Sequence, residues 1–375
     1  MSTGLSVPSN ICYLRCTRWK SRTVTCSVQA LLDLLILANR MISLLTDLPA
    51  ALTIAMFLIL GAVVGYVIVR FVIHSSLDTA ASKSSLGKWG LVIQAGTALL
   101  FAAFVVAVVF FKCQQIEMVR PSETWWYGRI FYHLILIGLL VAATSTDFRE
   151  YIILDRITVV GTLIGLLGAS FSGQLQLVHL WIDWNQVDTV VNGRIEHWGA
   201  YIPTWFDESR HWHGLAWSSV GAATGAGTIW LIRFVASQML GREALGFGDV
   251  MLMGMIGSFL GWQPVCFVFL LAPLCGVVVG LSVRMIAGQT FVPFGPFLSL
   301  ATVLVLFGWR WLWKPTREVF GHATTLVLLG AISLTVLVLL LGLLRVYHWI
   351  PVSGRRQTNG ESSEKDQPKI SQRSG

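Results

Sequence analysis

Long apolar runs separated by short polar stretches dominate this sequence of 375 residues. The runs do not alternate between apolar and polar positions as barrel strands do, so we expect helices. A helix needs about 20 apolar residues to cross a bilayer. The pattern therefore predicts an all-α, polytopic transmembrane helical bundle of about eight or nine spans. The predicted helices cover residues 51–73, 90–111, 130–147, 156–171, 214–236, 249–262, 264–285, 293–309 and 323–346.

The polar stretches divide the chain into five predicted parts. The first, residues 1–50, is basic and then weakly apolar and lacks the pattern of a signal peptide, so Met41 and Met56 are candidate true starts. The last, residues 350–375, is polar and expected to be disordered. Between them lie the first two spans (51–129), a core (130–309) with an outer-loop insertion (172–213), and the last span (310–349).

The charges of the loops predict which side of the membrane each one faces. The loop 172–213 has two basic and five acidic residues, whereas the tail carries five basic ones. Because Lys and Arg accumulate in cytoplasmic segments, we place the tail in the cytoplasm. The basic N-terminus and residues 310–322 run against this assignment. The segments expected on the cytoplasmic side with the tail are 74–89, 147–155, 237–248 and 286–292.

The composition excludes a soluble globular domain. Only 12% of the residues are charged and 55% are hydrophobic, whereas soluble domains carry about 25% charged residues. A net charge of +8 would suggest a nucleic-acid partner for a soluble protein. No basic run with interleaved aromatic residues is present, so we expect the basic residues to flank the spans and expect no nucleic acid as partner.

Cysteine and histidine predict neither a disulfide framework nor a metal site. The six cysteines form no C-x-x-C pair, and Cys266 and Cys275 lie in an apolar run that suits small core residues. His211 and His213 have no third ligand in view, so we interpret them as solvated. No cofactor is expected.

Two further patterns favour packing over chemistry. Five tryptophans in the loop 172–213 predict an interfacial aromatic layer, with a substrate-contacting surface as the alternative. Glycines four positions apart within the spans predict that helix backbones approach closely. The tryptophans are Trp181, Trp184, Trp198, Trp205 and Trp212, and the glycine pairs are Gly161/Gly165, Gly221/Gly225, Gly257/Gly261 and Gly276/Gly280.

Two acidic side chains lie at the ends of apolar runs on the predicted cytoplasmic side. Asp147 closes the third helix in AATSTDFRE, and Asp249 opens the sixth in GFGDVMLMGMIG. Charges at the mouth of a membrane bundle are costly and are therefore often functional, although either one alone suits solvation among headgroups. Gly246 and Gly248 remove side-chain bulk before Asp249, so a helix or a substrate strand can approach it.

Elementary electrostatics predicts what the two carboxyl groups do if they meet. The start of a helix favours the ionised form of Asp249, and a second carboxyl group beside it is driven toward its protonated form. The pair then shares one proton, as in aspartic proteases. The ionised group activates a water, while the protonated group polarises the scissile carbonyl and later protonates the leaving amine. Neither a metal nor a nucleophilic side chain is needed.

Three segments of the chain resemble, in the same order, the motifs of the type IV prepilin peptidases. The first is TDFREYIILDR followed by TVVGTLIGLL, in which Asp147 and Asp155 occupy the two aspartate positions. The second is GFGD followed by VMLMGMIGSFLGW, and the third is FVPFGPFLSLA at 291–301. The resemblance covers about residues 130–309.

The resemblance implies a membrane-embedded aspartyl endopeptidase of the bacterial inner membrane. Its substrates would be prepilin-like (pseudopilin) proteins, whose leader peptides are cut after a Gly at the cytoplasmic face. Asp147 and Asp249 would be the catalytic pair, and Asp155, Gly246 and Gly248 would support them. Asp155 has a second interpretation as the N-cap of the following helix.

Three features depart from the family's pattern. Asp147 and Asp249 are 102 positions apart, farther than is usual, and the loop 172–213 accounts for the excess. Bifunctional members carry a cysteine-bearing segment after the first helix, whereas 74–89 has no cysteine. The first helix ends in GAVVGYVIVRFVIH, which only faintly resembles the family's Gly-Ser-Phe-Leu-Asn pattern. We therefore expect the peptidase without methyltransferase activity.

Other functions were weighed against the same residues. Presenilin-like and signal-peptide-peptidase-like enzymes share G-x-G-D but pair it with Pro-Ala-Leu, which this chain lacks. A proton-coupled transporter would place its carboxylates near the midplane and show repeated halves, and neither pattern is present. The transporter and a catalytically idle homologue kept for assembly stay open as alternatives, and no pattern predicts an oligomeric state.

Overall fold

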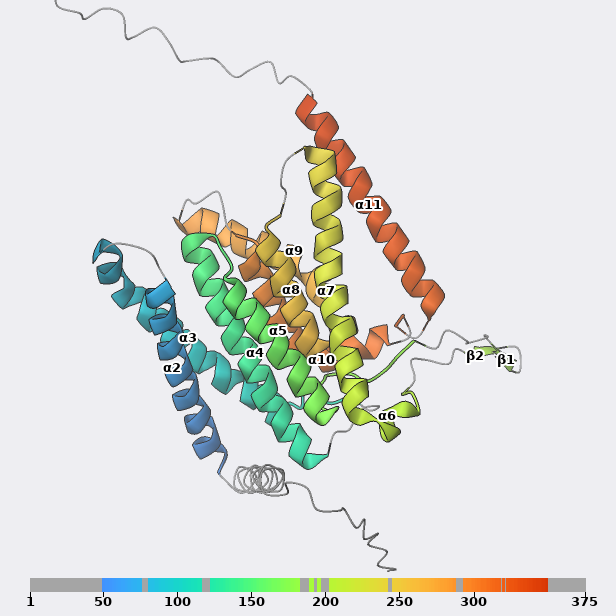
Figure 1. Ribbon diagram of the computed structural model, residues 1–375, viewed down its shortest axis with the longest axis horizontal. Helices are drawn as coiled ribbons and strands as arrows, with labels where there is room; N and C mark the ends of the chain where they lie inside the picture. Colours follow the sequence, from blue (N-terminus) through green and yellow to red (C-terminus); the bar gives the residue numbers. More distant parts are fainter. Residues whose placement is uncertain are drawn as a thin grey trace, which may run out of the picture.

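The computed structural model is a bundle of long helices that contains every helix the sequence predicts (Figure 1). It describes residues 49–75, 80–116, 122–182, 189–191, 194–196, 202–241, 245–287, 293–317, 319–320 and 322–349. The long helices are α2 (Ala50–Ser75), α3 (Ala80–Val109), α4 (Glu123–Glu150), α5 (Asp155–Ser172), α7 (Arg210–Leu240), α8 (Phe247–Leu260), α9 (Trp262–Ala287), α10 (Gly295–Thr316) and α11 (Ala323–Trp349). The predictions for residues 1–48 and for the tail from 350 onward lie outside this set.

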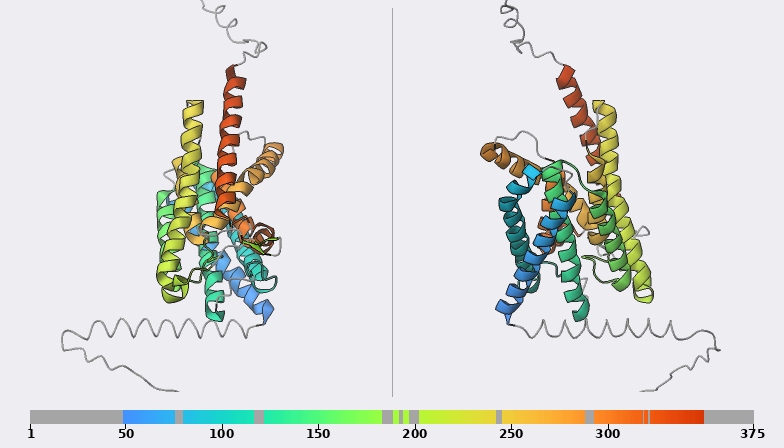
Figure 2. Two further views of the ribbon diagram at one scale, coloured as in Figure 1. Left: turned by 90° about the vertical axis from the view of Figure 1, so that its right-hand side faces the viewer. Right: turned by 60° about the vertical axis from the view of Figure 1, so that its left-hand side comes forward.

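Consecutive helices run in opposite directions, so the connections alternate between two ends of the bundle (Figures 1 and 2). One end, called the dyad end here, is where α4 and α7 finish and α8 and α10 begin. The other, called the loop end, carries the described residues between α5 and α7. The described part of that loop contains the short helix α6 (Trp205–Glu208) and a hairpin of β1 (Thr189–Val191) with β2 (Arg194–Glu196). The predicted alternation of the loops is therefore present in the fold.

Seven of these helices are long and apolar enough to cross a membrane, by length and composition. The two that the sequence predicts to be shortest, α5 and α8, are not among the seven. Large apolar side chains cover the outside of the bundle, and α11 stands at its margin against α7 (Figure 2). The chain is a multi-pass membrane protein, with fewer full-length spans among its described residues than the eight or nine expected.

Glycine allows α5, α7 and α8 to pack with their backbones in contact. A Cβ at Gly257 of α8 would overlap the carbonyl of Gly221 in α7, and one at Gly165 of α5 would overlap the Ser258 side chain. The predicted glycine pairs of these three helices thus lie at helix contacts, as expected for small residues in membrane bundles. The fourth pair is only half right, because Gly280 of α9 has nothing within 4 Å of a Cβ position.

Candidate active site

Asp147 lies in the last turn of α4, at the dyad end. Its side chain is 5% exposed, and its backbone carbonyl accepts the N–H of Tyr151 at 3.0 Å. Tyr151 has a φ of 55°, a left-handed conformation that ends the helix abruptly. The chain can therefore fold back beneath Asp147 within a few residues.

Asp249 occupies the third position of α8 and is 8% exposed. The N-cap residue of this helix is Gly246, whose backbone N–H interacts with the Asp249 carboxylate. A side chain at the third position that reaches back to the N-cap amide is half of a capping box. The helix start therefore holds Asp249 in place and favours its negative charge.

A third segment completes the surroundings of Asp147. The backbone N–H of Gly295, the first residue of α10, interacts with the Asp147 carboxylate. A Cβ at Gly295 would overlap the nearer carboxylate oxygen of Asp147 and lie 3.3 Å from its Cγ. The absence of a side chain is therefore what lets this helix start approach Asp147.

Ile153 joins the three segments beneath the two aspartates. It is 7% exposed, and its Cβ lies 3.0 Å from where a Cβ on Gly248 would be. Its Cδ1 lies 3.0 Å from the corresponding point on Gly295. One aliphatic side chain thus contacts the turn before Asp249 and the helix start beside Asp147.

The structure brings Asp147 and Asp249 together. The ends of α4 and α8 that carry them lie at the same end of the bundle, α4 contacts both α8 and α10, and the charge of Asp147 acts on Asp249. When two buried carboxyl groups interact in this way, ionising both at once is unfavourable. The pair is therefore suited to hold one proton. No group of three His, Cys, Asp or Glu side chains suited to a metal occurs within the described ranges.

Two residues of the site were not singled out from the sequence. Gly295 lies within the Pro-Phe-Gly-Pro segment, and a Gly-Pro step at the start of an apolar run is a detectable helix-start signal. Ile153 carries no such signal, because its role depends on contacts between three distant segments. Asp155 is exposed and is the first residue of α5, whose N-cap is Leu154, so the N-cap interpretation of Asp155 is wrong.

The loop end is closed by side chains. His213, interpreted as solvated from the sequence, is 0% exposed. Trp181 donates its indole N–H to His213 Nε2 at 2.7 Å, and the ring lies between Trp205, Phe206 and Trp217. This interpretation was therefore wrong for His213, whereas His211 is exposed. Of the described loop tryptophans, Trp181 and Trp205 belong to this cluster and Trp212 is exposed, while Trp184 and Trp198 lie outside the described residues.

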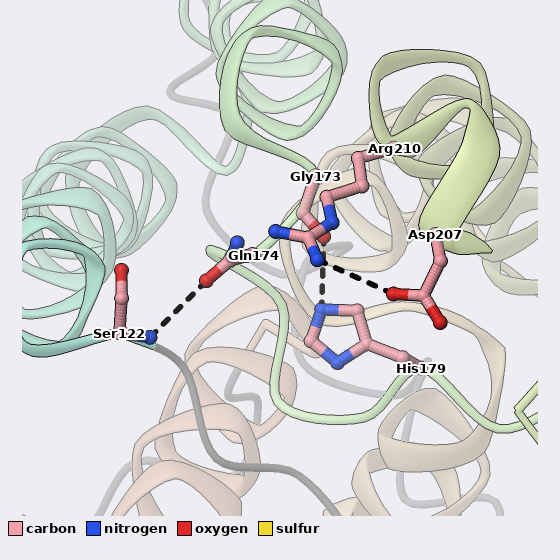
Figure 3. Close-up of polar contacts among 6 residues, drawn as sticks. All are labelled: Ser122, Gly173, Gln174, His179, Asp207 and Arg210. Atoms are coloured by element: carbon pink, nitrogen blue, oxygen red, sulfur yellow. Dashed lines mark hydrogen bonds and ion pairs between the residues drawn. The ribbon is translucent and has the colours of Figure 1, made fainter. Parts of the chain in front are cut away.

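The polar contacts of this end run through the segment after α5. Ser122 donates its backbone N–H to Gln174 Oε1 at 3.2 Å, and His179 donates from Nε2 to the Gly173 carbonyl at 3.0 Å (Figure 3). Arg210 pairs with Asp207 at 3.2 Å on the exposed side of the same region. The loop is thereby bonded to the start of α4 through Gln174 and to the start of α7 through Asp207.

Comparison with known proteins points to one family. Residues 199–281, which include Asp249 but not Asp147, match the type IV leader peptidase family. The prepilin leader peptidase/N-methyltransferase of Pseudomonas putida is 26% identical over 203 residues, which is 52% of this chain and 56% of that protein. The type 4 prepilin-like proteins leader peptide-processing enzyme of Escherichia coli O78:H11 is 27% identical over 210 residues, 52% of this chain and 73% of that protein.

A prepilin leader peptidase/N-methyltransferase of Aeromonas salmonicida is 31% identical over 180 residues, 46% of this chain and 47% of that protein. The chain thus spans about half the length of two of these relatives and nearly three quarters of the third. No solved structure matches the chain.

Proposed function

Because residues 199–281 match the type IV leader peptidase family and about half of the chain is similar to prepilin leader peptidases, we propose that the chain belongs to this family and is a membrane-embedded aspartyl endopeptidase that removes leader peptides from type IV prepilin-like proteins. The observation that carries the proposal is the pair Asp147 and Asp249, two buried carboxyl groups whose charges interact at one end of the bundle. Each is approached by the backbone N–H of a helix start, at Gly295 and Gly246.

The pair can divide the chemistry of peptide hydrolysis between its members. With one shared proton, the ionised carboxylate takes a proton from a water that attacks the scissile carbonyl carbon. The protonated carboxyl group donates a hydrogen bond to the carbonyl oxygen. The tetrahedral species then collapses as the leaving amine receives a proton from the pair. Gly246, Gly248 and Gly295 support this by leaving room for backbone at both carboxyl groups.

The dyad end is proposed to face the cytoplasm of a bacterial inner membrane. This assignment rests on charge, because the tail that follows α11 at the dyad end carries five basic residues, whereas the loop 172–213 is acidic. A leader peptide on the cytoplasmic side of its span would then reach the pair without crossing the bilayer.

The methyltransferase named for two of the relatives is not part of the proposal. The name N-methyltransferase belongs to the Pseudomonas and Aeromonas proteins. In this chain the connection 74–89 has no cysteine, and we assign only the peptidase.

The test uses the full-length protein in detergent or nanodiscs with a prepilin-like substrate. Asp147→Asn and Asp249→Asn keep the shape of each side chain but remove its ability to carry the proton. Each should lower the cleavage rate by roughly 10²- to 10⁴-fold, and the double variant should be little worse than either single one because the pair acts as a unit. Asp207→Asn, an exposed aspartate at the loop end, is the matched control. Cleavage at the wild-type rate by either site variant would show that the pair is not catalytic.

A further inference from the structure

A fully buried cation lies at the loop end, opposite the dyad. Arg129, in the second turn of α4, is 0% exposed. Its Nη2 donates to the backbone carbonyl of Gln174 at 3.2 Å, and the Trp126 ring lies 5.9 Å from its Cζ. Its Nε and Nη1 have no hydrogen-bond partner among the described residues. These two nitrogens carry three of the five N–H hydrogens of the guanidinium.

No carboxylate in the described part of the chain pairs with this charge. The ion pair described at the loop end joins Arg210 to Asp207, whose side chains are 47% and 75% exposed. Burying a charge without a partner costs far more free energy than one hydrogen bond to a carbonyl contributes. An ionisable group inside a membrane bundle therefore calls for a partner of opposite charge.

Two histidines beside Arg129 are also only half satisfied. His133, one turn further along α4, is hydrogen-bonded through Nδ1 to Gln114 Oε1 at 3.2 Å and leaves Nε2 unpartnered among the described residues. His179 donates from Nε2 to Gly173 (Figure 3), and its Nδ1 is likewise unpartnered there. The charge of Arg129 acts on both rings.

His179 is neutral in this setting. Burial and the nearby charge of Arg129 hold the pKa of His179 well below its ordinary value. Since Nε2 is the donor, Nδ1 of the neutral ring carries a lone pair, and it would become a donor if a bound anion drew a proton onto the ring. The three side chains thus offer donors and latent donors with no negative charge to receive them.

We propose that Arg129, with His133 and His179, binds a phosphate-type oxyanion at the loop end, either inorganic phosphate or the phosphodiester of an anionic lipid headgroup. Guanidinium donors match phosphate oxygens in geometry and charge. The same guanidinium holds the Gln174 carbonyl, so the anion would fix the segment after α5 against α4. The site is independent of the peptidase chemistry, because it lies at the other end of the bundle.

The test compares two sources of phosphate on the full-length protein. In phosphatidylcholine nanodiscs, inorganic phosphate is titrated against chloride at equal ionic strength, and Tm and phosphate binding are measured. In a second arm, phosphatidylglycerol replaces part of the phosphatidylcholine and no free phosphate is added. We expect one arm to raise the Tm of the wild type, and that arm identifies the source. Arg129→Gln should abolish the rise, whereas Arg210→Gln, an exposed arginine of the same region, should retain it.

Arg129→Lys is a second variant, to be used if Arg129→Gln does not fold. It keeps the charge but replaces the planar fork of five donors with three donors on a compact ammonium, so it should bind the active probe at least roughly tenfold more weakly than the wild type. The proposal fails if neither probe raises the Tm of the wild type, or if Arg129→Gln responds as the wild type does. It also fails if Glu117→Gln or Glu123→Gln lowers the Tm as much as Arg129→Gln does while phosphate has no effect, because the chain itself then supplies the counter-charge.

Discussion

The two ends of the bundle both bury polar groups, but they do so with different parts of the chain. At the dyad end, Asp147 and Asp249 are surrounded by glycines, backbone N–H groups and one aliphatic side chain. At the loop end, His213 and Arg129 are enclosed by indole rings and other large side chains. The dyad end is therefore built from closely packed backbone, while the loop end is closed by side chains.

This difference predicts opposite sensitivities. Adding atoms should damage the dyad end, because backbone there lies against the two carboxyl groups. Removing atoms should damage the loop end, because its groups depend on one another for hydrogen bonds and packing. The following variants test this contrast, beginning with the largest expected effect.

Gly295→Ala should lower the cleavage rate by roughly 10²-fold while the protein stays folded. The new methyl group would overlap an Asp147 carboxylate oxygen and displace it, and a displacement of about 1 Å at a reacting group costs on this order. Gly308→Ala in the same helix is the control, because its Cβ would lie 3.8 Å from Leu312. Equal cleavage rates for the two variants would show that the close approach of α10 to Asp147 does not matter for cleavage.

Gly221→Ala lies between the two ends of the bundle and should lower the free energy of unfolding by about 1–3 kcal/mol. The added Cβ would overlap the Gly257 carbonyl of α8, and backbone cannot rotate away as a side chain can. Gly227→Ala, in the same helix, has nothing within 4 Å of its Cβ and should leave Tm unchanged or slightly raised. A Tm for Gly221→Ala equal to that of this control would contradict the contact.

Trp181→Phe should cost about 1 kcal/mol of stability and leave the cleavage rate per folded molecule unchanged. The change removes the indole N–H that His213 Nε2 accepts at 2.7 Å, so a buried ring nitrogen loses its partner. Trp212→Phe, with a side chain 69% exposed, is the control and should have the wild-type Tm. A rate loss in Trp181→Phe without a loss of stability would couple the loop end to the chemistry.

Asp155→Asn should have the smallest effect, about 0.3–1 kcal/mol in stability, because its charge lies in the first turn of α5 and interacts with the helix dipole. The cleavage rate should be close to that of the wild type. A 10²-fold rate loss would instead place Asp155 in the catalytic machinery and not only beside it.

The helices were predictable because the membrane selects long apolar runs, but three helix starts were misplaced, two of them for one shared reason. The third is that of α3, which is expected from residue 90 and begins at Ala80. The sequence predicts starts at 130 and 214, whereas α4 begins at Glu123 and α7 at Arg210. Each early turn contains a charged or polar side chain that the fold buries, Arg129 in one case and His213 in the other. A single sequence does not show which neighbours will cover such a group.

The candidate site, like the helices, was predictable only in part. Asp147 and Asp249 are conspicuous as charges at the ends of apolar runs, so their position in the bundle followed from topology. The parts that were missed, Gly295 and Ile153, act through three segments that meet only in the folded chain. The Gly-Pro step at Gly295 marks a helix start but not its approach to Asp147, and the aliphatic side chain of Ile153 carries no chemistry that marks it in advance.

The position of Ile153 has a mechanical consequence. Its side chain lies against both Gly248 and Gly295, so a shift of α10 or of the first turn of α8 should be transmitted through it to the other segment. A displacement of either segment should therefore disturb the surroundings of both carboxyl groups and not of one alone.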